Sequence, residues 1–389
     1  IYPGRMFLLD LEKGQIVNDN ELKSQLSTQK PYGEWLDKHR IFLEDLPFDK
    51  PEVHPENSLV TLQRAFGYTL EDLRMIMEPM AATGYEPTGS MGNDAPLAFL
   101  SDENPLLFNY FKQLFAQVSN PPLDAIREEL VTSLRATIGE ERNLFDESPE
   151  HCRQIAVQKP ILNNDDMERI KQSDQTGLQA RTIKIHYNPN DKNPIQKAMD
   201  RVRQEASKAV SEGYSIIVLS DKDIDQTHAP IPSLLATAGT HHHLIREGIR
   251  SKVGLAVETG EAREIAHFAL LIGYGAAVIN PYLAISTVER QIAGQNSSAN
   301  LDPDKSVLNY LEASHKGILK IMSKMGISAI QSYRGAQIFE AVGLSNEVID
   351  EYFTGTPSRI GGISIEEIEA EALERHHSAY EIDDIAGNM

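Results

Sequence analysis

Three consecutive histidines, His241, His242 and His243, form the most conspicuous group of potential metal ligands in this chain. A helix has 3.6 residues per turn, so neighbouring side chains point about 100° apart and three consecutive rings do not converge on one ion. Helical metal pairs are spaced three or four residues apart, and on a strand only His241 and His243 would share a face. We therefore expect helix packing from the triplet, and keep a metal-binding module as a third hypothesis.

Charged side chains at the ends of predicted strands are the second group that could perform chemistry. Asp221, Glu258 and Arg334 each end or follow such a strand, which is where (β/α) enzymes hold their functional groups. Arg334 stands in a Ser-Tyr-Arg-Gly segment that could bind an anion through its guanidinium and backbone N–H groups. Asp221 could equally cap a helix or form a turn. A self-sufficient (β/α) enzyme that uses these three residues is the alternative function.

The elements that would position these residues change in character near residue 155. The first 150 residues indicate mainly helices and irregular segments, whereas short β-branched runs alternate with helices further on. Apolar strands that alternate with helices are typical of buried parallel sheets. We predict an α/β fold with a partial or degenerate (β/α) TIM-barrel-like core, preceded by a mostly helical N-terminal region. Its strands are expected at 180–188, 214–221, 252–260, 276–283 and 327–333.

Helical periodicity predicts further elements on both sides of residue 155. Thr69 and Asp72 are spaced as a capping box that opens a helix over 69–84. Two more helices are predicted in the N-terminal region, and a helix is predicted after each strand. These helices are expected at 104–120, 123–139, 193–213, 232–251, 261–275, 306–326 and 335–343, with an acidic helix and a loose tail after residue 363.

Composition narrows the classes of function. The 389 residues carry a formal net charge of −20, which argues against nucleic acid or an anionic membrane surface as a partner. No apolar run reaches the 18 residues of a membrane span, and the first residues do not form a signal peptide. Because the chain starts at Ile1, we expect a fragment of something larger. Its one cysteine, Cys152, allows no intrachain disulfide and suits a reducing compartment.

Long stretches spread over most of the chain resemble the central domain of the glutamate synthase family, large iron–sulfur flavoproteins. A shorter stretch, PGRMFLLDLEKGQI at 3–16, resembles the tail of the amidotransferase domain that precedes it. The end of the chain resembles the lead-in to the FMN-binding domain. The central-domain stretches are EPMAATGYEPTGSMGNDAPLAFLSD (78–102), FKQLFAQVSNPPLDAIREELVTSL (111–134), the run from APIPSLLATAGTHHHLIREG to INPYLA (229–284), KGILKIMSKMGISAIQSYRGAQIFEAVGL (316–344) and FTGTPSRIGGIS (353–364).

The resemblance implies a division of labour within the parent enzyme, an oxidoreductase that acts on CH–NH2 donors. In the family, an N-terminal cysteine hydrolyses L-glutamine, and the ammonia passes through an internal tunnel to the FMN domain. There it adds to 2-oxoglutarate and reduced flavin delivers hydride, so that two L-glutamate are formed in ammonia assimilation. Electrons come from ferredoxin or an NADPH-oxidising subunit through an iron–sulfur cluster. The implied location is the bacterial cytoplasm or the plastid stroma.

For this chain the resemblance implies a connecting domain without catalytic residues. Ile1 is not the N-terminal nucleophile, Cys152 lies mid-chain, and one cysteine cannot hold an iron–sulfur cluster. We therefore expect no cofactor or metal bound by this chain, with FMN and the cluster held elsewhere in the parent. The implied partners are the amidotransferase and FMN-binding domains of the same polypeptide, with neither nucleic acid nor membrane.

The resemblance also suggests domain boundaries and candidate interdomain residues. We expect the tail of the amidotransferase domain at 1–20, a helical N-terminal part of the central domain at 21–155, the barrel-like part at 156–360 and an acidic linker toward the FMN domain at 361–389. A path for ammonia should be lined by small or neutral polar groups and kept from bulk water. Three irregular segments supply candidates for the interface or the tunnel, although plain packing is an equal interpretation: Ser90, Met91, Asn93, Asn120, Lys324, Met325 and Ser328.

Overall fold

The computed structural model describes residues 2–50, 58–89, 96–114, 123–124, 126–293 and 301–386. Its centre is a four-stranded sheet in the order β12-β11-β9-β7, in which every neighbouring pair is parallel. The prediction of an α/β fold built on buried parallel strands is therefore confirmed, and four of the five predicted strands are present. They are β7 (Ala180–Lys184), β9 (Ile216–Ser220), β11 (Gly254–Glu258) and β12 (Val278–Asn280).

Both faces of this sheet are covered, which explains why its strands are almost entirely apolar. Successive side chains of a strand point to opposite faces. Ile217 and Leu219 of β9 therefore pack into the main core, whereas Ile216 and Val218 pack into a second core on the opposite face. The second core includes residues of β5 (Ala136–Ile138), β6 (Ile155–Val157) and α6 (Asn164–Lys171), and β3 (Ile41–Phe42) packs against it through Ile41.

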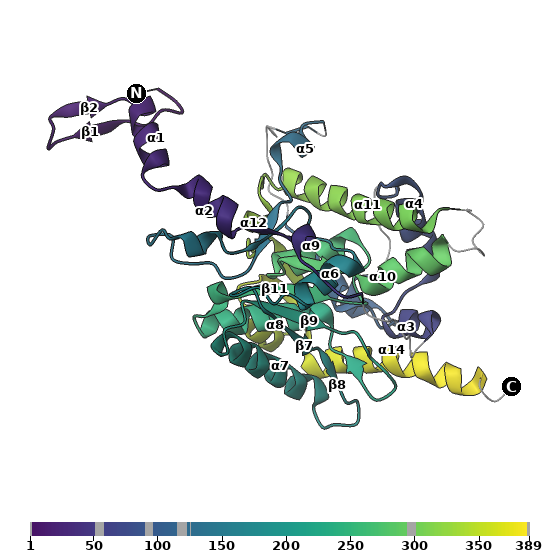
Figure 1. Ribbon diagram of the computed structural model, residues 1–389. Helices are drawn as coiled ribbons and strands as arrows, with labels where there is room; N and C mark the ends of the chain where they lie inside the picture. The colour runs from purple at the N-terminus through teal and green to yellow at the C-terminus, as the bar shows by residue number, and fades with distance from the viewer. Residues whose placement is uncertain are drawn as a thin grey trace.

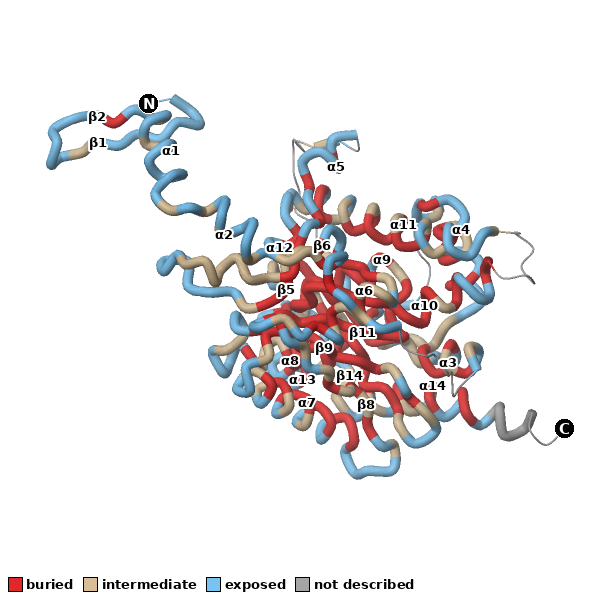
Figure 2. The backbone as a smooth tube through the Cα atoms, viewed as in Figure 1, coloured by how far each residue is buried: buried red, intermediate tan, exposed pale blue. Residues whose placement is uncertain are grey.

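Four of the five helices predicted to follow the strands are confirmed with shifted ends, as α7, α8, α9 and α11. Helix α7 buries Ile195, Met199 and Val202 at helical spacing, so one stripe faces the sheet and the opposite side faces solvent. Helix α9 is buried almost all round, as its position inside the fold requires (Figure 2). The principal helices are α7 (Pro194–Ser211), α8 (Ser233–Arg246), α9 (Ile265–Gly273), α10 (Tyr282–Thr287) and α11 (Pro303–Lys324), with short strands β8 (His186–Tyr187) and β10 (Ala229–Pro230) beside them.

The prediction for residues 327–343 is wrong in both of its elements. The expected strand 327–333 is instead a turn and the short helix α12 (Ile330–Tyr333), and the expected helix 335–343 is strand β13 (Phe339–Leu344). Gly335 and Gln337 adopt positive φ angles of 69° and 54°, which stops a helix at this point. Strand β13 then pairs with β14 (Ser358–Ile363) and β4 (Phe111–Gln113), forming a separate three-stranded sheet.

Two predicted helices of the N-terminal region are also replaced by shorter elements. The described part of 104–120 forms the 3-10 turn Leu107–Tyr110 and then β4, because β4 finds a partner in β13. Among the described residues of 123–139, only α5 (Glu128–Val131) is helical, and β5 pairs with β6. The prediction for 69–84 is confirmed as a π-helical turn (Asp72–Met77) and α4 (Glu78–Thr83). Its predicted capping box forms, with reciprocal hydrogen bonds between Thr69 and Asp72.

An arm at the N-terminus extends away from the body (Figure 1). It consists of the hairpin β1 (Leu8–Asp10) and β2 (Gln15–Val17), followed by α1 (Asp19–Thr28) and α2 (Tyr32–His39). Neither helix has a buried residue. Large apolar side chains of the hairpin region are exposed, namely Phe7, Leu8, Leu9, Leu11 and Ile16. The arm therefore presents an apolar surface that the described part of the chain leaves uncovered.

The C-terminal acidic helix is confirmed as α14 (Ile365–Ala386), which runs along α3 (Leu59–Ala65) and projects past the body (Figure 1). Its buried residues Ile368, Ala372 and His376 follow one another every four positions, so one face of the helix packs on the body. The remaining helix is α13 (Asn346–Tyr352). None of the helices in the described ranges is both long and apolar enough to cross a membrane.

The contact between β13 and β14 generates the first prediction. A Cβ atom on Gly362 would lie 2.1 Å from the backbone oxygen of Gly343, whereas a Cβ on Gly361 would meet nothing within 4 Å. Gly362→Ala must therefore push the two strands apart, and we expect it to lower the free energy of unfolding by about 2 kcal/mol. Gly361→Ala, the matched control, should stay within about 0.5 kcal/mol. Urea unfolding of both variants checks this, and equal midpoints would contradict the close approach.

Candidate functional site

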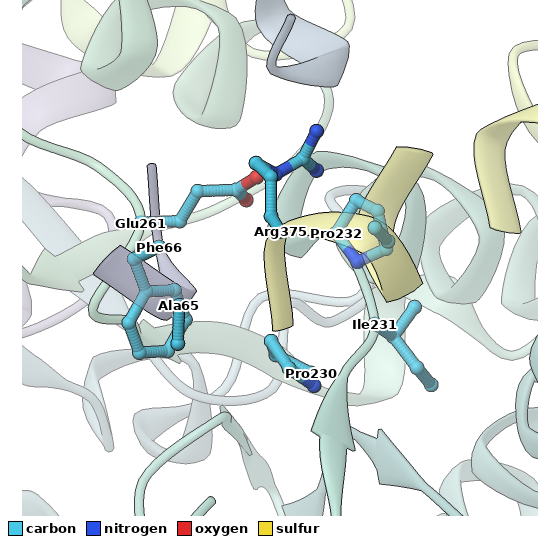
Figure 3. A pocket seen from close by; sticks show the side chains of 8 residues that line it. Ala65, Phe66, Pro230, Ile231, Pro232, Glu261 and Arg375 are labelled. Atoms are coloured by element: carbon cyan, nitrogen blue, oxygen red, sulfur yellow. The ribbon is translucent and has the colours of Figure 1, made fainter. Parts of the chain in front are cut away.

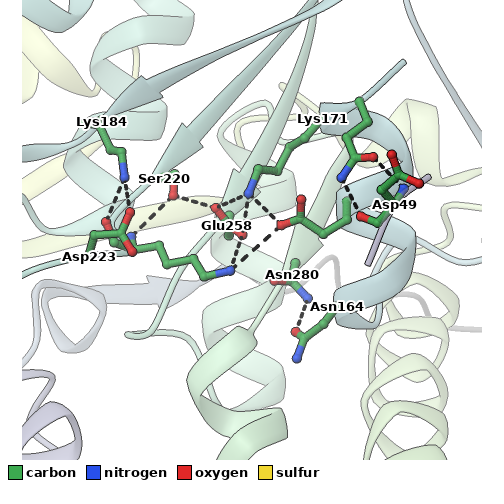
Figure 4. Close-up of polar contacts among 11 residues, drawn as sticks. Asp49, Asn164, Lys171, Lys184, Ser220, Asp223, Glu258 and Asn280 are labelled. Atoms are coloured by element: carbon green, nitrogen blue, oxygen red, sulfur yellow. Dashed lines mark hydrogen bonds and ion pairs between the residues drawn. The ribbon is translucent and has the colours of Figure 1, made fainter. Parts of the chain in front are cut away.

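The carboxyl ends of the four central strands meet at one edge of the sheet. Lys184, Ser220, Glu258 and Asn280 are the last residues of β7, β9, β11 and β12, and the strand register places them in one row. Figure 4 shows this row with the charged side chains around it. Open parallel sheets and (β/α) barrels bind ligands at this edge, so these residues are the candidate functional site.

Glu258 is the centre of the row. It is only 2% exposed, and its Oε2 accepts a 2.5 Å hydrogen bond from the Ser220 hydroxyl. Lys171 Nζ and Lys222 Nζ lie 3.3 and 3.6 Å from its Oε1. Glu168 joins the cluster, 2.7 Å from Lys171 Nζ and 3.8 Å from Lys222 Nζ. Two lysines and two glutamates therefore balance one another, and the carboxylate of Glu258 is already fully occupied.

The electrostatics of the cluster agree with its geometry. Burial acts to lower the pKa of Lys171, but the neighbouring carboxylates of Glu258 and Glu168 outweigh it and raise that pKa above its ordinary value. Lys171 therefore keeps its proton and acts as a fixed counter-ion. A lysine in this state supplies charge balance and cannot serve as a general base near neutral pH.

Asp221 is a second buried carboxyl group beside this row, and its exposed fraction is zero. It accepts hydrogen bonds from the Thr259 hydroxyl at 2.5 Å and from the backbone N–H of Gly260 at 2.8 Å. Burial raises the pKa of Asp221 to about 8. The next carboxylate, Glu261, accepts from the backbone N–H and the hydroxyl of Ser233 at the start of α8, where a helix favours negative charge.

The other strand ends are also occupied by partners. Lys184 pairs with Asp223, and the Asn280 amide donates to the backbone oxygen of Leu162 and to Asn164 Oδ1. One cavity beside Glu261, between α14 and the start of α8, has a volume of about 10 Å³ and could hold one water molecule at most (Figure 3). Eight residues line it: Ala65, Phe66, Pro230, Ile231, Pro232, Glu261, Ala372 and Arg375.

A larger groove of about 220 Å³ lies at another part of the surface, between α11 and the segment that precedes α6. None of the four strand-end residues lines it. Its walls are mainly apolar, with Lys159 and Glu312 as an ion pair at the rim. The polar strand ends of the sheet therefore have partners within the protein, and none of their side chains lines either of these two cavities.

The three residues of the predicted enzyme do not come together. Asp221 and Glu258 do lie at the carboxyl edge, where the Asp221 backbone N–H donates to the Glu258 carbonyl. Arg334 does not lie at this edge. The prediction that it follows a strand is wrong, because it follows helix α12. The N–H of the adjacent Gly335 donates to the carbonyl of Gly273, in the turn that leads from α9 to β12. Arg334 therefore lies near the opposite edge of the sheet.

The histidine triplet occupies the last turns of α8, and each ring has its own neighbours. His241 Nδ1 accepts from Arg250 Nε at 2.9 Å, and His243 Nε2 lies 2.8 Å from the Ser207 hydroxyl. The His242 ring stands edge-on to that of His241 at a centroid distance of 5.1 Å. Burial lowers the pKa of His241 to about 2 and that of His242 to about 4. Across the described ranges, no three or more His, Cys, Asp or Glu side chains are arranged to hold a metal ion.

Three of the seven candidate interdomain residues lie in the described part of the chain. Lys324 and Ser328 are exposed and Met325 is half-buried, at the end of α11 and in the turn after it. Lys324 Nζ lies 3.9 Å from Glu128 Oε1, and the Ser328 carbonyl accepts from the N–H of Ser133. The turn is thus held beside α5. The other four, Ser90, Met91, Asn93 and Asn120, lie outside the described residues.

Sequence reasoning missed the basic partners of the site. Lys222 could have been predicted, because it directly follows Asp221 in the sequence. Lys171 could not, because it belongs to helix α6, and nothing in the local sequence indicates that this helix packs beside the strand ends. Exposed apolar residues in and just before α5 were also missed, because 123–139 was expected to be one helix. Ile126 is 90% and Leu130 is 85% exposed, and α5 itself contacts α11.

Two family models match the chain. Residues 61–345 match the glutamate synthase central domain, and residues 1–35 match the class-II glutamine amidotransferases. The large chain of NADPH glutamate synthase from Bacillus subtilis is 46% identical over 381 residues, which cover 98% of this chain and 25% of the relative. The ferredoxin-dependent glutamate synthase of Pyropia yezoensis is 39% identical over 388 residues, covering 97% of this chain and 25% of that relative.

The chain thus spans about a quarter of the length of these relatives. Among solved structures, a flavocytochrome b2 mutant aligns with 88% of this chain and 97% of its own at 12% identity and a TM-score of 0.38. That likeness is too weak to define the fold.

The charge balance around Glu258 can be tested by an isosteric change. Glu258→Gln keeps a hydrogen-bond partner for Ser220 but removes the carboxylate that two lysines face, so we expect the free energy of unfolding at pH 7 to fall by about 3 kcal/mol. Glu312→Gln, which breaks the partly exposed pair with Lys159, should cost less than about 1 kcal/mol. Denaturant unfolding measures both, and similar small losses would contradict a central role for Glu258.

The buried carboxyl group of Asp221 predicts a pH dependence. Between its ordinary pKa of 3.8 and the folded value of about 8, the folded state holds a proton that the unfolded state releases. Stability from this group is therefore lost as the pH rises through that window. Asp221→Asn should flatten the decline in melting temperature between pH 5 and 8, whereas Asp223→Asn, in the same loop, should not. An unchanged slope in Asp221→Asn would show that another group causes the decline.

Proposed function

The chain belongs to the glutamate synthase central domain family, and from this we propose that it is the connecting domain of a glutamate synthase. In this role it joins a glutaminase domain to a synthase domain that binds FMN and 2-oxoglutarate, and helps to wall the path of ammonia between them. The observation that carries the proposal is the pair of adjoining family matches, with class-II amidotransferases over 1–35 and the central domain over 61–345.

The arm supports a connection to the amidotransferase domain. The amidotransferase match covers the hairpin β1–β2 and α1, the part of the chain that reaches away from the body (Figure 1). Leu9 and Leu11 are 50% and 83% exposed there. A hairpin of this size is marginal by itself, so a covering domain would explain both its apolar side chains and its stability. We propose that the tail of the amidotransferase domain spans 1–20 and that the central domain starts at 21; since the amidotransferase match continues to residue 35, α1 would lie at the join of the two domains.

The remaining boundaries follow the same proposal. The helical N-terminal part would run to 155, the barrel-like part from 156 to 360, and the linker toward the FMN domain from 361 to 389. We propose that the four βα units are an incomplete (β/α) barrel, because β7, β9, β11 and β12 are parallel and adjacent in chain order, as barrel strands are. In the described part of the linker, α14 is packed on the body through Ile368 and Ala372.

The parent polypeptide would carry the chemistry in its other domains. We propose that it forms two L-glutamate from L-glutamine and 2-oxoglutarate, with FMN and an iron–sulfur cluster held outside this chain. Relatives named for NADPH and for ferredoxin match this chain comparably, so either electron donor fits. Relatives from a bacterium and from a chloroplast are consistent with the bacterial cytoplasm or the plastid stroma.

The surface at the end of α11 is our proposed contribution to the ammonia path. Met325 and Ser328 lie there, and the α5 region, which contacts the end of α11, carries the exposed Ile126 and Leu130. Apolar groups left exposed in a contiguous region suit an interface. Such a wall would also exclude bulk water and keep ammonia from being protonated or lost. Ser90, Met91, Asn93 and Asn120 remain candidates for the same path.

The alternative of a self-sufficient (β/α) enzyme has less support. Glu258 is neutralised by lysines, Asp221 is enclosed, and Arg334 lies away from both. None of the three lines either cavity described above.

Enlarging Met325 tests the connecting role in the longer polypeptide that carries this chain. Met325→Trp should narrow the proposed path, so glutamate formed per glutamine hydrolysed should fall severalfold while synthesis from added ammonia stays unchanged. Leu308→Trp is the control, since Leu308 is 65% exposed on the same helix but belongs to its other end. Failure of the longer polypeptide to make glutamate would overturn the function, whereas intact coupling in Met325→Trp would overturn only the location of the path.

A further inference from the structure

Arg334 has a guanidinium group for which the described residues supply no partner. It is half-buried, and its Nη2 atom is buried without a hydrogen bond. A guanidinium carries five N–H donors and a permanent charge, and leaving such a group buried and unpaired is costly. Buried polar groups in folded proteins nearly always have a partner, so this side chain calls for a ligand outside the described part of the chain.

A second arginine, Arg250, lies against the turn 273–275 and forms no ion pair with the described residues. Arg250 donates to three neutral acceptors: His241 Nδ1 at 2.9 Å, the Val253 carbonyl at 2.6 Å and the Gly275 carbonyl at 2.9 Å. Gly335, next to Arg334, donates to the carbonyl of Gly273, at the other end of this turn. The turn 273–275 is therefore held between the two arginine-bearing segments.

The charge around the pair is positive. Burial and, to a smaller extent, the positive charge of Arg334 together lower the pKa of Arg250 to about 10, as expected for two guanidinium groups that repel each other. The carboxylate of Glu141 attracts both but lies within ion-pair distance of neither among the described contacts. His241 accepts a hydrogen bond from Arg250 and stays neutral, so one positive charge remains in excess on a chain whose net charge is −20.

The surface beside Arg334 is open. Gly335 is exposed and has a φ of 69°, and an added Cβ there would meet nothing within 4 Å. A ligand could therefore approach along Gly335, the residue next to Arg334. Planar or tetrahedral oxyanions match the fork of N–H groups on arginine.

We propose that Arg334, supported by the charge of Arg250, forms an oxyanion-binding site at the surface formed by α8, α12 and the turn 273–275. The ligand is a carboxylate or phosphate group. It comes either from a free small anion or from an acidic side chain of the longer polypeptide, because both present the same oxygen geometry. The site is separate from the Glu258 row, which lies at the opposite edge of the sheet, and it does not depend on the proposed connecting function.

Anion-dependent melting of the 389-residue chain tests the site. Inorganic phosphate, compared with chloride at equal ionic strength, should raise the melting temperature by roughly 2 °C at a concentration about tenfold above its dissociation constant. Phosphate also stabilises proteins non-specifically. The specific effect is therefore the saturable part that Arg334→Gln abolishes and Arg359→Gln, at an arginine with an 82% exposed side chain, retains.

A second readout separates binding from structure. Arg334→Gln relieves the repulsion with Arg250, so without phosphate it should melt no lower than wild type. Arg334→Lys should retain the charge but weaken phosphate binding about tenfold, because the fork is lost. An Arg334→Gln variant that is destabilised equally with and without phosphate would assign Arg334 a structural role and overturn the proposal. So would a phosphate effect that is absent from wild type or persists in Arg334→Gln.

The longer polypeptide distinguishes the two sources of the oxyanion. If an acidic side chain of that polypeptide occupies the site, the specific phosphate effect should disappear there, and Arg334→Gln should lower its melting temperature. If the ligand is a free anion, the phosphate effect should persist in the longer polypeptide and remain dependent on Arg334. Both results support the site and differ only in what fills it.

Discussion

The parallel sheet is covered on both faces, and this constraint determines the chemistry of its edge. Ile217 and Leu219 face one core while Ile216 and Val218 face the other, so no polar residue within β9 could reach water. Polar groups appear only where the strands end, and there they must be neutralised inside the protein. Glu258 meets two lysines, and Asp221 accepts two hydrogen bonds. The row resembles the binding edge of a (β/α) enzyme in position, but its groups satisfy one another.

Much of the parallel sheet could be predicted from the sequence, because strands buried on both faces are almost continuously apolar. The segment 327–344 could not. Its two elements depend on the backbone at Gly335 and on a partner, β4, that lies more than two hundred residues earlier in the chain. Helix and strand are hard to distinguish in short apolar segments, because the strand or helix against which such a segment packs determines its conformation.

The candidate site was predictable to a similar degree. Glu258 and Asp221 were expected at the carboxyl edge, because strand ends can be counted along the chain. Their counter-ions were not, since Lys171 reaches the edge from a helix that precedes the sheet. Arg334 was assigned to the wrong edge as a direct result of the wrong strand at 327–333. A wrongly predicted strand thus misplaced its site residue, whereas the correctly predicted strands put their last residues at the correct edge of the sheet.

The docked C-terminal helix has a mechanical consequence. Twenty-two residues of uninterrupted helix span about 33 Å, and Ile368, Ala372 and His376 fix its direction against the body. A segment attached to Ala386 would therefore begin at a fixed distance and in a fixed direction from the sheet. A flexible linker would allow many distances between the body and the attached segment. This docked helix favours one distance, and a displacement or rotation of one end would be transmitted along its axis.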